Sequence, residues 1–172
     1  WGYFYLCGPK NAEYKHGESN GKTYVSTEFS LDPSVEYDVL FAYDDVKCLK
    51  YFGKSTDAYW KTKGISIEEA VCEAEAESDD MLSKCRELSQ GVADDGENAG
   101  GEKYAELLSL AFRQTVAAHK LAVDENGEII FISKECFSNG CAATVDVTYP
   151  SAPFFLLYNP ELLKGMLRPV FK

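Results

Sequence analysis

The sequence lacks a long apolar run, is poor in basic residues and contains only two histidines. Its longest apolar run, near residues 154–157, is far too short to cross a bilayer, so no transmembrane segment is expected. Lys and Arg number 17 against 28 Asp and Glu, which gives a net charge of −11. Nucleic acid is a disfavoured partner because phosphate binding needs a basic surface. With His16, His119 and no Cys-x-x-Cys pair, no metal site is expected.

Both ends of the chain lie inside predicted elements. Residues 1–6 have strand composition and carry neither an initiating Met nor a charged leader region, so this chain shows no targeting signal. Residues 162–172 have the apolar spacing of a helix that we expect to continue. Domain boundaries are normally polar and flexible. We therefore expect an internal piece of a longer polypeptide, and the remainder of that polypeptide is an expected partner.

The six cysteines do not form the pattern of a small disulfide framework. At 172 residues and 45% hydrophobic residues, the chain is long and apolar enough to build a core without one. Cys136 and Cys141 are close enough in sequence to form a disulfide. The sequence leaves open whether they do.

Residues 1–45 are predicted to be β-rich. Aromatic and β-branched residues gather in three short runs, at 3–6, 22–26 and 37–43, and turn residues separate the runs. The Asn20-Gly21 pair predicts a tight turn. Residues 46–64 contain large aromatic side chains and are predicted to be a connecting segment packed on a neighbouring surface.

Two helices are predicted next. Ser66 and Glu69 match a capping box, and apolar spacing continues the helix over residues 67–88. Acidic residues dominate between Glu68 and Glu97. We read this run as a solvated helix face with an exposed loop, and the alternative is an acidic binding patch. Residues 91–101 are predicted to be a polar loop, and a second helix over 102–121 completes a helical hairpin.

A β-hairpin and a further helix follow. Residues 120–123 and 128–133 have strand composition and flank a turn at 124–127. Residues 134–153 are predicted to be irregular. Asn159 as N-cap and Pro160 at the first helical position predict a helix start. The predicted class is therefore α+β, with a β-rich segment, a helical hairpin, a β-hairpin and a final helix.

Candidate catalytic groups gather in the irregular segment over residues 133–150. Glu135 and Asp146 are a possible carboxylate pair for acid–base chemistry. Ser138 and Asn139 are suited to binding a substrate amide, and Tyr149 is a further candidate substrate contact. The alternative is structural, with a turn at Asn139, local hydrogen bonds from Asp146 and packing by Tyr149.

The second predicted helix carries two further candidate residues. Arg113 lies at the edge of its buried stripe and is a candidate partner for a substrate carboxylate, although an ordinary structural salt bridge is favoured on general grounds. His119 lies near the end of the helix. A histidine in that position more often caps helix carbonyl groups than performs catalysis.

Four long sequence words carry a family resemblance. They are VLFAYDD at 39–45, AFRQTVAAHKL at 111–121, FISKECFSNG at 131–140 and TVDVTYPSAPFFLLYNPELL at 144–163. In these words and in their order, the chain from about residue 35 to residue 172 resembles the glutaminase A family of fungi and bacteria. Cys136 and Cys141 depart from the residues typical of that family.

The resemblance implies a specific architecture and activity. It implies a β-sandwich-like domain that ends near residue 45, and a six-helical-hairpin toroid that begins near residue 65 and is only partly contained here. It also implies hydrolysis of L-glutamine to L-glutamate and ammonia, without a cofactor, by exported (secreted or periplasmic) enzymes. The expected partner is glutamine or a related amide, and we expect the chain to be inactive alone.

Three functional hypotheses follow. In amide hydrolysis, Glu135 or Asp146 activates water or a nucleophile, Asn139 holds the amide and Arg113 orients the α-carboxylate. In glycoside hydrolysis, which helical toroids also host, a second carboxylate lies about 5–10 Å from one of the two acids. A non-catalytic binding or scaffold module instead predicts that Glu135, Asp146 and Arg113 form a closed, buried network.

Overall fold

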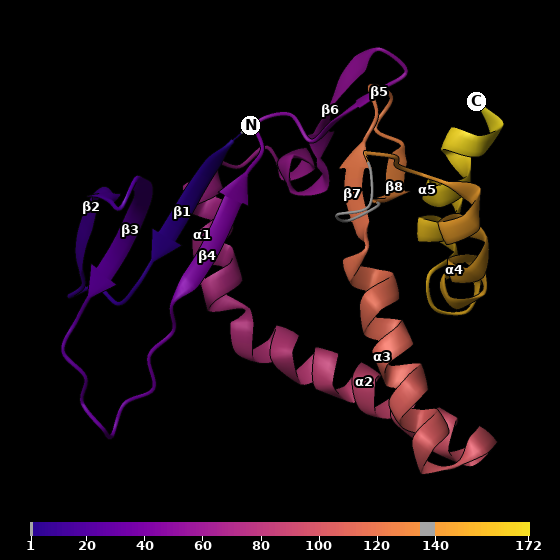
Figure 1. Ribbon diagram of the computed structural model, residues 1–172, viewed down its shortest axis with the longest axis horizontal. Coiled ribbons are helices and arrows are strands. Elements are labelled where there is room, and N and C mark those ends of the chain that lie inside the picture. The colour runs from indigo at the N-terminus through magenta and orange to yellow at the C-terminus, as the bar shows by residue number, and fades with distance from the viewer. Residues whose placement is uncertain (1, 135–139) are drawn as a thin grey trace. The chain divides into compact units, whose positions relative to one another are not determined.

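The computed structural model describes residues 2–134 and 140–172 (Figure 1). It confirms the predicted α+β class. Two compact units are present: the chain up to Val46 together with Ser66–Ala76, and Lys47–Ile65 together with Glu77–Lys172. The β-sandwich, the toroid and the domain limits near residues 45 and 65 stay predictions.

The first unit contains two antiparallel strand pairs and one helix. Its elements are β1 (Tyr3–Cys7), β2 (Glu13–Ser19), β3 (Lys22–Glu28), β4 (Leu40–Asp44) and α1 (Ile67–Ala76). β1 pairs with β4, and β2 pairs with β3. The three predicted strands therefore form, and residues 13–19 provide a fourth.

Local sequence signals account for two features of this unit. Asn20 and Gly21 join β2 to β3 with φ angles of 53° and 72°, the left-handed conformation that such a tight turn requires. The capping box at the start of α1 also forms. The Ser66 N–H donates to Glu69 Oε2 at 2.8 Å, and the Glu69 N–H donates to Ser66 Oγ at 3.2 Å.

The second unit is built on a four-stranded antiparallel sheet. Its order is β5-β6-β7-β8, formed by β5 (Leu49–Tyr51), β6 (Lys54–Ala58), β7 (His119–Val123) and β8 (Ile129–Ser133). A short 3-10 helix, η1 (Tyr59–Lys63), follows β6. The predicted hairpin is therefore confirmed as β7 and β8, and residues of the expected connecting segment form the other two strands.

Alternating side chains divide this sheet into two apolar faces. Ala122 and Ile130 pack with Tyr51 on one face. On the opposite face, Phe131 packs with Phe155 and Met166. These last two residues belong to α4 (Val145–Tyr158) and α5 (Pro160–Phe171), which therefore cover one face of β7 and β8 (Figure 1).

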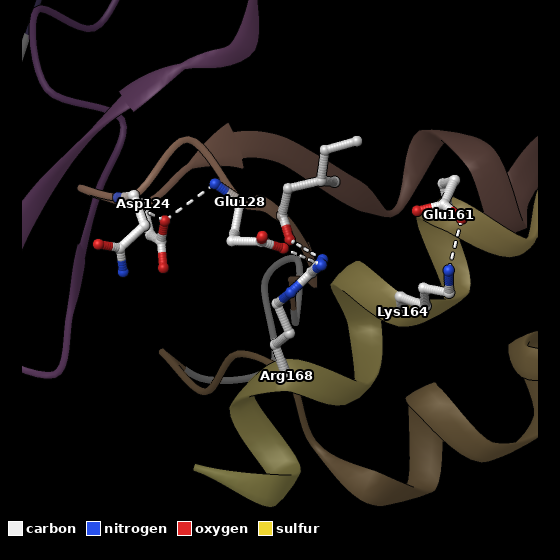
Figure 2. Close-up of polar contacts among 7 residues, drawn as sticks. Asp124, Glu128, Glu161, Lys164 and Arg168 are labelled. Atoms are coloured by element: carbon white, nitrogen blue, oxygen red, sulfur yellow. Dashed lines mark hydrogen bonds and ion pairs between the residues drawn. The ribbon is translucent and has the colours of Figure 1, made fainter.

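Close packing and one arginine fix α5 on β8. A Cβ atom at Gly165 would lie 2.9 Å from Ile129 Cγ2 and 3.1 Å from the Phe131 nitrogen, so only glycine permits this approach. Arg168 donates one hydrogen bond to the Ile129 carbonyl oxygen at 2.7 Å and forms an ion pair with Glu128 (Figure 2). The predicted start of α5 is confirmed, because the Leu162 N–H donates to Asn159 Oδ1 at 3.3 Å.

The helical hairpin forms, but the predicted polar loop over residues 91–101 is wrong. Helix α2 (Ser78–Gly100) continues through these residues and meets α3 (Glu102–Ala117) at Gly101, and the two helices lie side by side (Figure 1). Val92 and Gly96 are buried, and a Cβ atom at Gly96 would lie 2.8 Å from Ala105 Cα. Gly96 therefore allows the two helices to pack closely and does not form a loop.

The single helix predicted over residues 67–88 is also wrong, because α1 ends at Ala76 and α2 begins at Ser78. Glu77 separates them with φ of −96° and ψ of 0°, which lies outside the helical region. The acidic residues of both helices are largely exposed, as expected of a solvated face.

The irregular structure predicted over residues 134–153 is wrong for its second half. Helix α4 begins at Val145 and contains Pro150 and Pro153. Thr148, Ser151 and Phe155 are buried at helical spacing, and this burial outweighs the hydrogen bonds that the prolines remove. Within the described ranges, no helix combines the length and apolar character that crossing a bilayer requires.

Candidate functional site

Backbone hydrogen bonds anchor both ends of the segment that carries most predicted site residues. Lys134 forms an isolated antiparallel bridge with Ala142, and the Ala143 N–H donates to the Ser133 carbonyl oxygen at 2.9 Å. The Lys134 N–H donates to the Ala118 carbonyl oxygen at 2.8 Å. The chain thus leaves β8 and returns to the same point before α4 begins.

An unusual backbone conformation marks the return of this segment. Ala143 has φ of 54°, in the left-handed region that residues other than glycine seldom adopt. Such a residue persists only when the surrounding contacts fix it, and strained residues concentrate at functional sites. The hydrogen bond of Ala143 to Ser133 and the neighbouring bridge supply that constraint.

The predicted site residues fall into two groups. Glu135, Ser138 and Asn139 lie outside the described residues, as does Cys136, so the possible Cys136–Cys141 disulfide is left open. The described group consists of Arg113 on α3 and Asp146 and Tyr149 on α4.

All three described site residues face solvent. Arg113 and Asp146 are exposed, and 79% of Tyr149 is exposed. Asp146 lies in the first turn of α4, where a carboxylate interacts favourably with the helix dipole. The buried network of Glu135, Asp146 and Arg113 that a scaffold module predicts stays a hypothesis, because Glu135 lies outside the described residues.

His119 caps the end of α3, as its position in the sequence predicts. Its Nδ1 atom lies 2.6 Å from the Thr115 carbonyl oxygen, so Nδ1–H donates to that oxygen. The ring stacks on Phe131 with centroids 4.6 Å apart, and the edge of Phe155 contacts it. Burial lowers the pKa of His119, while the hydrogen bond to Thr115 acts in the opposite direction. The folded protein therefore favours the neutral imidazole.

The half-buried His119 shares a face of the sheet with a buried polar residue, Ser133. His119 and Ser133 are opposite residues in the β7–β8 ladder, so their side chains share one face of the sheet. Among the described residues, His119 Nε2 and the Ser133 hydroxyl are buried and have no hydrogen-bond partner. Leaving a buried polar atom unsatisfied costs about 1–3 kcal/mol, so such groups usually bind water or serve function.

The spacing of these two residues in the sequence does not by itself predict that they lie together. The signal that joins them is the hairpin register, because a turn centred on residues 124–127 brings residue 119 opposite residue 133. His119 and Ser133 therefore lie next to the start of the segment that begins with Lys134.

Comparison with known proteins identifies relatives of the C-terminal part. Residues 101–172 match the model of the glutaminase A six helical-hairpin domain. Glutaminase A of Aspergillus oryzae is 40% identical over 87 residues, which cover 51% of this chain and 12% of that protein. A protein named probable glutaminase from Arthroderma benhamiae is 36% identical over 95 residues, which cover 53% of this chain and 11% of the relative.

The chain thus spans only about a tenth of the length of these curated relatives. No solved structure is a significant match. The matched domain includes α3, the β7–β8 hairpin, α4 and α5. Residues 101–172 are therefore similar to the six helical-hairpin domain of the glutaminase A family, and the comparisons support the resemblance to that family found in the sequence.

Proposed function

We propose that the protein containing this chain hydrolyses the side-chain carboxamide of L-glutamine to give L-glutamate and ammonia. The observation that carries the proposal is the match of residues 101–172 to the glutaminase A domain, together with two relatives whose names state glutaminase. The matched residues contain the anchored segment and Asp146. The proposed reaction needs no cofactor.

In this proposal, an acid–base group activates water or a protein nucleophile for attack on the amide carbon. Glu135 and Asp146 are the candidates for that role, because proton transfer by a positioned carboxyl group accelerates such reactions about 10²–10⁴-fold. Asn139 and Ser138 hold the amide, and Tyr149 contacts the substrate. The exposure of Asp146 and Tyr149 supports their access to a substrate.

Glycoside hydrolysis is the alternative chemistry for a helical-hairpin domain, and the names of the relatives do not favour it. Fold alone does not choose between two reactions. The binding of an amino acid also requires a group that neutralises the α-carboxylate, for which Arg113 was the candidate from sequence. Arg113 is exposed on α3, and we propose that it neutralises the α-carboxylate.

The direct test is ammonia release by the full-length protein. Purified protein is supplied with L-glutamine, with L-asparagine as an amide one methylene shorter, and with aryl glycosides. We expect ammonia in equal amount to L-glutamate, a lower kcat/KM for L-asparagine and no release of aryl alcohol. Folded protein that cleaves a glycoside and leaves glutamine intact would replace the proposal with the alternative.

By resemblance, we also propose that the full-length protein is exported. Separation of the medium or periplasm from the cytoplasm of the native host tests this, because an exported protein appears in the outer fraction. Recovery in the cytoplasm alone would oppose export.

A further inference from the structure

The strand pairing of the β7–β8 hairpin brings the side chains of His119 and Ser133 together. The two residues are partners in the register of the hairpin. The Lys134 N–H donates to the Ala118 carbonyl oxygen at 2.8 Å, and hydrogen-bonded and non-hydrogen-bonded pairs alternate along an antiparallel ladder. The neighbouring pair, His119 with Ser133, is therefore non-hydrogen-bonded, which is the kind of pair whose side chains lie closest.

The polar atoms of these two side chains are complementary. The Nδ1–H group of His119 donates to the Thr115 carbonyl oxygen at 2.6 Å, which leaves Nε2 as a hydrogen-bond acceptor in the neutral ring. Burial lowers the pKa of His119, against the effect of the bond to Thr115, and so favours that neutral ring. The Ser133 hydroxyl is a donor. Both Nε2 and this hydroxyl are buried without a hydrogen-bond partner among the described residues, and a bond from Ser133 Oγ–H to Nε2 satisfies both atoms at once.

Apolar side chains surround the two residues. The His119 ring stacks on Phe131 with centroids 4.6 Å apart, and the edge of Phe155 contacts it with centroids 5.3 Å apart. Met166 belongs to the same buried cluster as these two phenylalanines. An apolar environment strengthens a hydrogen bond and raises the cost of leaving a polar atom unpaired. The Ser133 hydroxyl and His119 Nε2 therefore gain most by bonding to each other.

Ser133 also fixes the chain at the point where it returns to the sheet before α4. Its carbonyl oxygen accepts a hydrogen bond from the Ala143 N–H at 2.9 Å. Ala143 has φ of 54°, a conformation that persists only when surrounding contacts fix it. Thr144 follows as the N-cap residue of α4, and its carbonyl oxygen accepts the Thr148 N–H at 2.9 Å. Asp146 lies in this first turn, so the backbone of Ser133 helps to set the position of the Asp146 carboxylate.

We propose that His119 and Ser133 form a hydrogen-bonded positioning pair for Asp146, in which Ser133 Oγ–H donates to His119 Nε2. The inference rests on the proposed function, in which Asp146 is a candidate acid–base group. Thr115 fixes the His119 ring at the end of α3, so the pair connects the end of α3 to the start of α4 through Ser133. In this role neither residue touches the substrate, which agrees with the burial of both polar atoms.

The experiment is a double-mutant cycle in the full-length protein. Ser133→Ala removes the hydroxyl donor, and Ser133→Thr keeps one. His119→Phe removes both ring nitrogens and keeps an aromatic ring for stacking. Ser55→Ala, at an exposed serine of the same sheet, is the matched control. Each change is made in the parent and in Asp146→Asn.

Three measurements are made on each variant. Ammonia release gives kcat and KM for L-glutamine. Hydrogen–deuterium exchange of the peptide that contains Ala143 reports how firmly the chain is held where it returns to the sheet. Thermal unfolding confirms the fold.

We expect Ser133→Ala and His119→Phe each to lower kcat about tenfold with KM within about threefold, because a small displacement of Asp146 costs less than the roughly 10²-fold loss of a 1 Å misplacement. In Asp146→Asn the same changes lower kcat less than about twofold, because the group that they position is gone. The peptide that contains Ala143 exchanges about tenfold faster in Ser133→Ala, as the loss of one buried hydrogen bond predicts. Ser133→Thr and Ser55→Ala stay near the parent in both measurements.

The outcomes separate this inference from the proposed function. If glutamine is hydrolysed while Ser133→Ala matches Ser55→Ala in kcat and in exchange, the positioning pair is wrong and the proposed function stands. If Ser133→Ala lowers kcat by the same factor in the parent and in Asp146→Asn, the inference is overturned, because the pair does not act through Asp146. If glutamine is not hydrolysed but exchange at Ala143 still rises in Ser133→Ala and His119→Phe, the pair is supported and the proposed function fails.

Discussion

Replacing either of two glycines in α2 by alanine should change the stability of the helical hairpin in opposite directions. Gly91 is exposed, and a Cβ atom there meets no atom within 4 Å. Gly96 is buried, and its Cβ atom would lie 2.8 Å from Ala105 Cα and 3.3 Å from Leu108 Cδ2. Alanine therefore adds the same methyl group in open space at Gly91 and in a tight helix contact at Gly96, five residues along the chain.

The magnitudes follow from two opposing effects. Alanine stabilises a helix interior by about 0.5–1 kcal/mol relative to glycine, so Gly91→Ala should raise the free energy of local unfolding by that amount. Overpacking costs about 1–3 kcal/mol, and the upper part of that range applies at Gly96 because a backbone atom cannot rotate away. After subtracting the helix gain, Gly96→Ala should lower the free energy by about 1–2 kcal/mol.

Hydrogen–deuterium exchange of the peptide spanning Val92 reports this local stability in the full-length protein. We expect slower exchange in Gly91→Ala and exchange about five- to thirtyfold faster in Gly96→Ala, as the free-energy differences require. If residues 91–101 formed a polar loop, both variants would exchange rapidly and alike. That result would refute the packed hairpin.

Other predictions test the cap, the histidine and the α5 contact. Ser66→Ala should destabilise α1 by about 1 kcal/mol, seen as faster exchange of its first turn, whereas Ser89→Ala at an exposed helix position should not. Because burial lowers the pKa of His119, its stabilising contribution is complete above the unfolded value near 6.5 and falls as acidification protonates the unfolded state. Unfolding midpoints should therefore drop between pH 7.5 and 5.5, and His119→Phe should flatten that slope while His16→Phe keeps it. Arg168→Met should cost about 1–2 kcal/mol by removing the hydrogen bond to Ile129, measurable as faster exchange of β8.

Local chemistry was sufficient to predict the elements that depend on neighbouring residues. The Asn20-Gly21 turn, the capping box at Ser66, the β7–β8 hairpin and the start of α5 at Asn159 all form as expected. Each of these signals specifies backbone conformation or a hydrogen bond within a few residues. Sequence alone is therefore informative at these positions.

The elements that were predicted wrongly from the sequence are those whose structure depends on tertiary packing. Gly96 is typical of a loop in the sequence. In the structure it is buried, because α3 approaches α2 closely at that point. Pro150 and Pro153 predict the absence of a helix. In the structure both lie within α4, whose buried face includes Phe155. Neither contact is visible before the partner elements are placed.

The candidate site was predicted in the same partial way. Residue types identified the segment from Ser133 to Tyr149, and the matched family domain includes it. Pairing between strands then revealed what spacing in sequence does not show. His119 lies opposite Ser133 because the register of the β7–β8 hairpin pairs the two residues.

The measurement that tests the central claim most directly is kcat/KM for L-glutamine in the full-length protein and its Glu135→Gln and Asp146→Asn variants. Glu161→Gln on α5 is the control, since Glu161 is an exposed acid paired with Lys164 outside the anchored segment. We predict that at least one of the first two variants loses about 10²-fold or more while remaining folded, and that the control keeps its activity. Activity within about threefold of the parent in both variants would contradict acid–base catalysis by this segment.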